Sequence, residues 1–233
     1  VLITTSNAHD ISELQPLVES NRVDGMLLTR ALEDDRALQY LSQANFPTAL
    51  TGTCRYDNII QVDTDNEGAA EKMTTLLIGK GFRRFAFLVK DMSYNVDRKR
   101  HEGFCRALIK NGISEKDQLF YNGSIRMEFL DAIIENIISK KVECIICGDD
   151  EICTMVMSRL QAEGYRIPKD VAIASLYNST NLDCYSPAVT AVSVAASQMG
   201  GTAVRQLIQR LRGENYEKKT MLDYDILFRK STN

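Results

Sequence analysis

Short runs of apolar residues alternate with amphipathic helical patterns along this chain. Residues 85–89 read F-A-F-L-V, with no polar position among them. Strands that are buried on both faces have this pattern, and they occur in parallel sheets that helices cover on each side. The alternation therefore predicts an α/β fold with parallel sheets flanked by helices.

The same patterns place the individual elements. Helical periodicity is clearest where Leu130, Ile133, Ile134, Ile137 and Ile138 recur at helical spacing, and similar stripes occupy 69–77, 152–160 and 203–211. The strands that we expect lie at 2–5, 25–29, 48–50, 59–62, 84–89, 118–121, 144–147, 171–176, 189–194 and 223–228. Strands and helices thus alternate in the way that βαβ units require.

Composition excludes several classes of protein. Lys and Arg total 28 and Asp and Glu total 31, for a net charge of -3. A chain that binds nucleic acid through its own surface needs a basic face, which this balance does not favour. No apolar run approaches the roughly 20 residues of a membrane span. Residues 1–5 lead directly into polar residues, unlike a signal peptide.

Cysteines form one suggestive motif, Cys144-x-x-Cys147, among six in the chain. Zinc would need further ligands, and the only histidines are His9 and His101. A redox pair would lie exposed at a helix start, whereas residues 144–147 read as a buried strand whose i and i+3 side chains point to opposite faces. We expect structural cysteines, no metal and no cofactor, and six free thiols suit a reducing compartment.

Polar residues that directly follow strands are the candidates for a binding site, because ligands of open α/β sheets bind at the carboxyl ends of the strands. Asp65 follows the strand at 59–62 within a few residues. Asp149 and Asp150 follow the strand at 144–147, and Tyr177 follows that at 171–176.

Eight short motifs occur in order along nearly the whole chain. They lie at 23–28 (V-D-G-M-L-L), 65–69 (D-N-E-G-A), 77–87, 100–108 (R-H-E-G-F-C-R-A-L), 147–152 (C-G-D-D-E-I), 164–173 (G-Y-R-I-P-K-D-V-A-I), 187–190 (P-A-V-T) and 229–232 (R-K-S-T). Each motif alone is weak, but the ordered set is specific. Together they resemble the effector-binding core of the lactose-repressor/galactose-repressor (LacI/GalR) family of bacterial transcription regulators.

This resemblance implies a fold of the periplasmic-binding-protein type I, with two Rossmann-like lobes joined by three crossovers. We expect an N-terminal lobe of residues 1–82 plus 194–218 and a C-terminal lobe of residues 83–193 plus 219–233. The family's N-terminal helix-turn-helix domain is absent from this sequence. Val1 falls where the family's second strand begins, so the first strand–helix unit of the N-terminal lobe is expected to be missing.

Two site residues have a plain chemical rationale. Arg100 falls at the position of the family's ligand-binding arginine, and a guanidinium fork can donate two parallel hydrogen bonds to neighbouring hydroxyls. The alternative for Arg100 is a solvated charge in the basic run 98–100. Asp149 matches a family position that contacts ligand. Its alternative is a helix N-cap, a role for which we expect Asp150 instead.

Two further candidates complete the predicted ligand-binding set. Tyr177 stands where many family members have Asp, so a carboxylate acceptor is replaced by a phenol that can stack on a sugar. Its alternative is a buried tyrosine with a satisfied hydroxyl. Asp65 matches a cleft position of the family, but Asp-Asn-Glu-Gly also reads as a helix start.

The resulting interpretation is a ligand-sensing core and not an enzyme, since no nucleophile–base pair, metal cluster or phosphate loop is evident. The resemblance implies a sugar-like effector in the cleft between the lobes, a cytoplasmic homodimer formed through both lobes, and operator DNA bound only by the absent domain. A periplasmic sugar receptor of the same fold is the alternative.

Overall fold

The chain consists of two compact units in the computed structural model, which describes residues 2–3, 10–123 and 127–233. The first unit comprises Val1–Thr64, Ser93–Val96 and Ala195–Asp223, and the second comprises Asp65–Met92, Asp97–Val194 and Tyr224–Asn233. Apart from the short stretch at 93–96, the chain passes between the units after Thr64, Val194 and Asp223. The strand expected at 2–5 lies partly outside the described residues.

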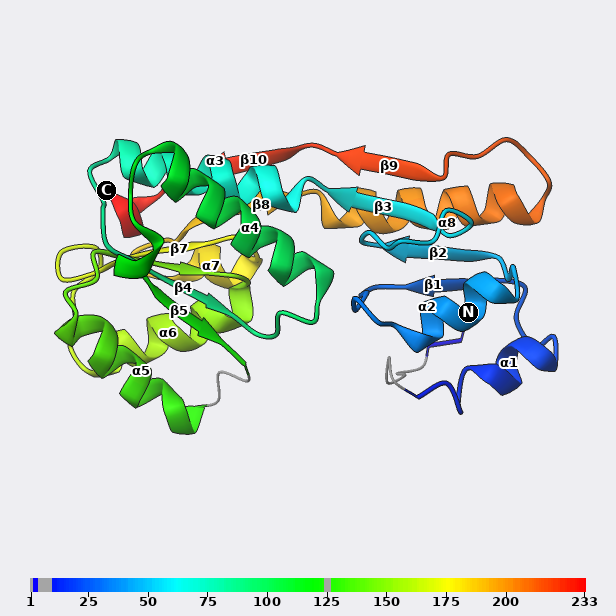
Figure 1. Cartoon of the computed structure of the whole chain (residues 1–233), viewed down its shortest axis with the longest axis horizontal. Helices are drawn as coiled ribbons and strands as arrows, with labels where there is room; N and C mark the ends of the chain where they lie inside the picture. The colour runs from blue at the N-terminus through cyan, green and yellow to red at the C-terminus, as the bar shows by residue number, and fades with distance from the viewer. Residues whose placement is uncertain (1, 4–9, 124–126) are drawn as a thin grey trace. The chain divides into compact units, whose positions relative to one another are not determined.

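The first unit is built on a parallel four-stranded sheet with the order β1-β2-β3-β9 (Figure 1). Ala203 and Leu207 of one helix pack against Ala49, Ile60 and Val62 of the sheet. The elements of this unit are α1 (Gln15–Glu19), β1 (Met26–Leu28), α2 (Arg36–Gln43), β2 (Thr48–Thr51), β3 (Ile60–Thr64), α8 (Ala196–Leu211) and β9 (Lys219–Leu222).

The second unit contains a six-stranded sheet with the order β10-β8-β7-β6-β4-β5. All neighbouring strands are parallel except the edge pair β10 and β8. Its elements are α3 (Asn66–Gly79), β4 (Phe85–Val89), α4 (Asn95–Lys110), η1 (Glu115–Asp117), β5 (Leu119–Asn122), α5 (Met127–Ser139), β6 (Cys144–Cys147), α6 (Asp150–Ala162), β7 (Ala172–Ser175), α7 (Thr180–Cys184), β8 (Thr190–Val194), β10 (Tyr224–Leu227) and η2 (Lys230–Thr232).

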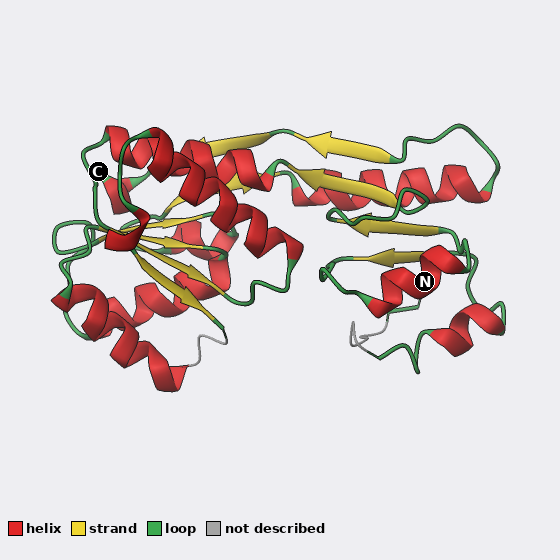
Figure 2. Ribbon diagram, viewed as in Figure 1, coloured by secondary structure: helices red, strands yellow, loops and turns green. Residues whose placement is uncertain are grey.

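Helices cover both faces of this sheet, which confirms the predicted α/β class (Figure 2). The helices α3 and α4 pack on one face, and α5 and α6 pack on the other. Residues of a single strand supply both cores: Cys144 faces α3 and α4, whereas Cys147 faces α5 and α6. Both cysteines are fully buried and free, as expected for a structural pair on opposite faces of a strand.

The glycine of the 100–108 motif has a packing role. A Cβ built on Gly103 of α4 would lie 2.1 Å from the carbonyl oxygen of Glu67 on α3, closer than real Cβ atoms approach. Only glycine therefore allows the two helices to come this close. The next residue, Phe104, stacks on Phe87 of β4 with ring centroids 4.7 Å apart. This contact fixes α4 against the sheet.

Among the segments that lie in a different unit from the one expected are a helix and a strand. The segment 66–79 was expected in the N-terminal lobe, but α3 packs its apolar face, with Met73 and Leu77, on the six-stranded sheet. The segment 219–222 was expected in the C-terminal lobe, but it forms β9 and pairs with β3 in the first sheet. Sequence periodicity shows that a helix has an apolar face, but not which of two sheets covers it.

The motifs at 187–190 and 229–232 meet in a group of residues that we call the C-terminal cluster: Thr190, Arg229, Ser231 and Thr232. Ser231 Oγ accepts a hydrogen bond from Thr190 N (2.8 Å) and donates one to Ile173 O (2.6 Å). Thr190 Oγ1 accepts from Arg229 N (2.9 Å) and lies 2.7 Å from Thr232 Oγ1. These bonds attach the end of the chain to β7 and β8.

Candidate functional site

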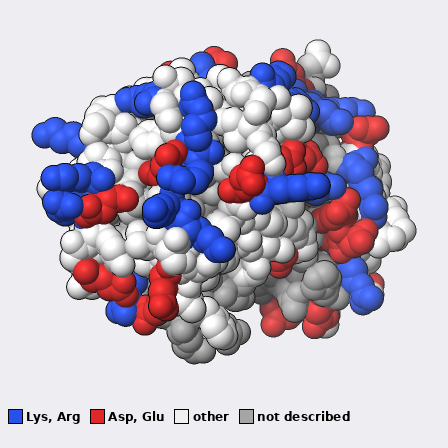
Figure 3. Space-filling view, turned by 60° about the vertical axis from the view of Figure 1, so that its left-hand side comes forward, with Lys and Arg blue, Asp and Glu red and all other residues white. Residues whose placement is uncertain are grey.

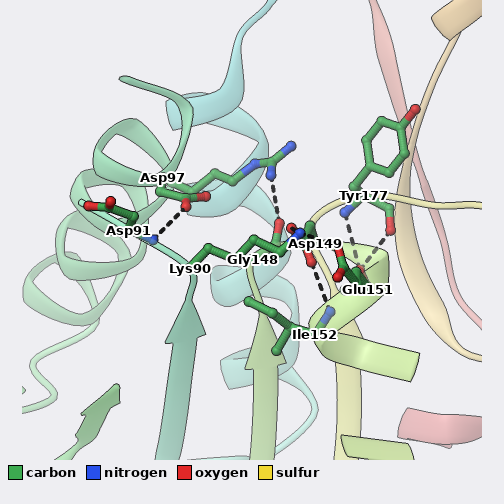
Figure 4. Close-up of polar contacts among 10 residues, drawn as sticks. Lys90, Asp91, Asp97, Gly148, Asp149, Glu151, Ile152 and Tyr177 are labelled. Carbon is green, nitrogen blue, oxygen red and sulfur yellow. Dashed lines mark hydrogen bonds and ion pairs between the residues drawn. The ribbon is translucent and has the colours of Figure 1, made fainter. Parts of the chain in front are cut away.

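Three strands of the second unit end side by side, which brings several predicted residues to one edge of the sheet. Leu88 of β4 pairs with Cys147 of β6, and Cys147 pairs with Ser175 of β7, so the carboxyl ends of the strands are level. Lys90, Asp149 and Tyr177 follow these three ends (Figure 4). This is the edge at which open α/β sheets bind ligands.

Asp149 both caps a helix and forms an ion pair. Its Oδ1 accepts a hydrogen bond from Ile152 N (2.9 Å), and its Oδ2 lies 3.0 Å from Lys90 Nζ. The expectation that Asp150 would cap this helix was wrong, because Asp149 has the extended backbone of an N-cap and Asp150 is already helical. Lys90 also pairs with Glu151, which is far more exposed than Asp149.

Arg100 is a buried side chain and not the solvated charge that its basic neighbours suggested. It is only 7% exposed, and its Nη1 donates a hydrogen bond to Gly148 O (2.6 Å). Gly148 immediately precedes Asp149, so this bond holds the guanidinium beside the end of β6. A Cβ on Gly148 would lie 2.9 Å from a methyl carbon of Val89, which explains glycine at this position.

Asp97 is a buried acid that was not among the predicted site residues. It is 5% exposed and lies on α4, three residues before Arg100. Its Oδ2 accepts a hydrogen bond from Asp91 N (3.2 Å). Burial raises the pKa of Asp97, although this hydrogen bond and the nearby Arg100 charge act in the opposite direction. The i, i+3 spacing of Asp97 and Arg100 was a signal that they share a helix face.

Lys90 was also missed, although the rule that identified Asp149 applies to it. It is a charged residue directly after the buried strand β4. Burial lowers the pKa of Lys90, but the hydrogen bonds that its amine donates to Glu151 and Asp149 raise it by more, so the pKa lies above its ordinary value. The amine is therefore charged at neutral pH and forms an ion-paired group with the two carboxylates.

Tyr177 presents a phenol ring at this edge. Its backbone is fixed by Ser175, whose Oγ donates to Tyr177 O (2.7 Å) and accepts from Tyr177 N (3.3 Å). The half-buried ring points away from the start of α6 in Figure 4. Its hydroxyl makes no hydrogen bond to the part of the chain that the structure describes, so the alternative of a buried, satisfied hydroxyl does not fit.

Asp65 has the geometry of a residue that begins a helix, which was the alternative to a ligand-binding role. It is the N-cap of α3, and its Oδ1 accepts a hydrogen bond from Gly68 N (2.9 Å). Its side chain is exposed. Among the described residues, no hydrogen bond or ion pair joins it to Arg100, Asp149 or Tyr177. The predicted set thus divides into Arg100, Asp149 and Tyr177 at the sheet edge and Asp65, whose hydrogen bond is that of a helix cap.

Metal binding and nucleophilic catalysis both require particular side chains to lie close together, such as a Cys–His pair. Residues 2–3, 10–123 and 127–233 contain no group of three or more His, Cys, Asp or Glu that could hold a metal ion. Cys105 lies 3.5 Å from His101 Nε2, but burial raises the pKa of this thiol to about 11. It is therefore protonated at neutral pH and not an activated nucleophile.

The face shown in Figure 3 carries both acidic and basic side chains, in keeping with the similar numbers of Asp plus Glu and Lys plus Arg in the chain. Lys and Arg side chains lie beside Asp and Glu over much of the face in Figure 3, and no broad basic surface dominates it. None of the helices within the described ranges is long and apolar enough to cross a membrane.

Comparison with known proteins places this chain in a family. Residues 74–232 match the model of the periplasmic binding protein-like domain. The HTH-type transcriptional regulator CelR of Thermobifida fusca is 26% identical over 99% of this chain and 70% of its own length. A putative LacI transcriptional regulator from Bacillus cereus subsp. cytotoxis has a solved structure with a TM-score of 0.89, at 28% identity, covering 98% of this chain and 83% of that one.

Another solved structure contains a ligand. The structure of a complex of CelR with cellobiose has a TM-score of 0.83 and 26% identity, covering 94% of this chain and 69% of that one. The chain belongs to the family of periplasmic binding protein-like domains and corresponds to the effector-binding core of LacI-type regulators. It spans 65–70% of the length of the first curated relatives, which are transcription regulators and not enzymes.

Proposed function

We propose that this core binds a neutral, sugar-like effector at the carboxyl edge of the six-stranded sheet. The observation that carries the proposal is Arg100, a nearly buried guanidinium held by Gly148 O beside the Lys90–Asp149 ion pair. A guanidinium and a carboxylate close together supply the donors and acceptors that vicinal hydroxyl groups require. Tyr177 adds a ring on which a sugar face can stack.

The charges at this edge favour a neutral effector over a sugar phosphate. Lys90 and Arg100 are opposed by three acids, Asp97, Asp149 and Glu151. Lys90 is paired with two of these acids, so it is not available to a phosphate without losing those contacts. The structural relative solved with cellobiose, a neutral sugar, supports the same class of ligand.

The regulatory role is the second part of the proposal. Effector binding favours one of two arrangements of the units, and this difference alters operator binding by an N-terminal helix-turn-helix domain in a cytoplasmic homodimer. The support is the likeness to DNA-binding regulators along most of their length. The test is operator binding by the parent protein, measured by fluorescence anisotropy with and without the effector.

The effector proposal is tested by thermal shift and calorimetry with neutral sugars, cellobiose first, and with glucose 6-phosphate. A sugar at about one hundred times its Kd adds about 2.7 kcal/mol of stability, a shift of several degrees in Tm. Arg100→Ala is expected to weaken binding by at least about tenfold, as loss of a charged hydrogen bond typically does. Arg166→Ala, at an exposed arginine paired with Asp170, is the control.

Two further variants keep the test decisive if Arg100→Ala folds poorly. Arg100→Lys keeps the charge but lacks the fork, so partial loss of affinity is expected. Tyr177→Phe removes only the hydroxyl. Unchanged sugar affinity in all three variants contradicts the assigned site, and binding of glucose 6-phosphate in preference to every neutral sugar contradicts the assigned class.

A further inference from the structure

A second candidate site lies at the opposite, amino edge of the same sheet. A hollow of about 640 Å³ opens there, within the size range of small-molecule sites. It is formed where the chain enters β4, β5 and β6. Because β4 has five residues, the hollow is about 16 Å from the edge that carries Lys90 and Asp149. The two sites therefore do not share residues.

Four basic side chains line the hollow: Arg83, Arg84, Lys116 and Lys140. Asp117 is the one acid among its lining residues in the described part of the chain. Lys116 and Lys140 are exposed, and neither makes an ion pair with any residue that the structure describes. The hollow therefore has an excess of positive charge with two lysine amines available to a ligand.

The two arginines are held in place by their own surroundings. Arg83 Nη1 donates to Ile78 O (2.7 Å) and Phe82 O (2.8 Å), and Arg84 Nη2 lies 3.4 Å from Glu143 Oε1. A guanidinium has five N–H donors, so these contacts leave others for a ligand. Arg83, which is fixed by two hydrogen bonds to carbonyl oxygens, loses little entropy when it binds an anion.

Glu143 neutralises part of this charge but is engaged with the backbone. Its Oε2 accepts hydrogen bonds from Arg83 N (2.6 Å) and Arg84 N (3.0 Å). Burial alone would raise the pKa of Glu143, but these bonds and the arginine charges lower it below its ordinary value. Four cations thus face two acids, one of which has a structural role.

Apolar residues make up the rest of the lining. Ile113 and Leu119 are half-buried, and Val142 is buried. An apolar wall next to basic groups suits a molecule that carries both a phosphate and an apolar or planar part. We propose that this hollow binds a small organic phosphate, separately from the effector at the opposite edge.

The test uses the 233-residue protein with three probes: adenosine 5′-monophosphate, inorganic pyrophosphate and adenosine. Isothermal calorimetry is expected to detect both phosphates but not adenosine, with affinity falling as salt rises. Lys116→Gln together with Lys140→Gln is expected to weaken binding of the monophosphate by about tenfold, the typical effect of losing charged hydrogen bonds. Lys169→Gln with Lys218→Gln makes the same change in net charge at exposed positions away from the hollow, and is expected to leave the affinity unchanged.

Two results would overturn the proposal. The first is no binding of either phosphate at about 10 mM, which corresponds to less than about 3 kcal/mol of binding free energy. The second is phosphate binding that is lost in Arg100→Ala but unchanged in the Lys116/Lys140 double variant. The phosphate would then occupy the edge that carries Lys90 and Asp149. The outcome is independent of whether a sugar binds at that edge.

Discussion

Two groups of polar residues in the six-stranded unit differ in what their polar atoms contact. In the C-terminal cluster, Thr190 and Ser231 are buried hydroxyl residues that bond to each other and to the backbone. At the carboxyl edge, Lys90 and Asp149 are partly exposed charges, and the hydroxyl of Tyr177 has no hydrogen bond in the described chain. Residues of the first kind hold the fold together, whereas we propose that those of the second kind contact a ligand.

Ser231→Ala is expected to have the largest effect on stability. The change leaves Thr190 N and Ile173 O buried without this partner, at a cost of about 1–3 kcal/mol. For a chain of this size each kcal/mol lowers Tm by about 2–4 °C. Thermal unfolding followed by circular dichroism measures the change. Lys230→Ala, at the exposed neighbouring residue, is the control, and equal Tm values for the two variants would show that the cluster is not structural.

Asp149→Asn is expected to have a smaller effect on stability and a large one on effector binding. Asn retains the cap on Ile152 N but loses the ion pair with Lys90, which contributes about 0.5–1 kcal/mol. Sugar affinity should fall well beyond what this change in stability explains. Calorimetry combined with urea unfolding separates the two effects. A variant that loses stability but keeps its affinity would place Asp149 with the structural residues.

Asp97→Asn is expected to have the smallest effect, and that effect should depend on pH. Because burial raises the pKa of Asp97 above its unfolded value of 3.8, the folded state binds the proton more tightly. Wild-type stability therefore has a contribution that is present at low pH and is lost as pH rises through the folded pKa. Asn does not titrate, so the variant should gain relative to wild type between about pH 4 and neutrality. Urea unfolding across this range measures the difference, and a constant difference would contradict the assignment.

The sequence predicted individual helices and strands better than it predicted which of them pair or pack together. The strand Phe85–Val89 was expected because uninterrupted apolar runs report burial on both faces. The strand Lys219–Leu222 was missed because it is short, begins with a lysine and has exposed residues at alternate positions. Its strand conformation comes from pairing with β3, more than 150 residues earlier in the chain. Local patterns contain no information on such a pairing.

The candidate site was only partly predicted, because its geometry also depends on contacts between distant parts of the chain. The rule that polar residues follow strands identified Asp149 and Tyr177, and the motif identified Arg100. The same rule applied to Lys90, which directly follows a strand. Its ion pair with Asp149 could not be predicted, because that contact requires two strands to end at the same level. The burial of Arg100 and Asp97 depends on how α4 packs, which Gly103 permits through its contact with α3.

The amino-acid sequence by itself determined the α/β alternation, the family, and the burial of Cys144 and Cys147 on opposite faces of one strand. Each of these follows from the local spacing of residues or from the order of motifs along the chain. Only the tertiary structure decided which sheet α3 covers, which aspartate caps α6 and which partners Ser231 meets. These depend on contacts between residues far apart in the chain, whose geometry arises only when the elements pack together.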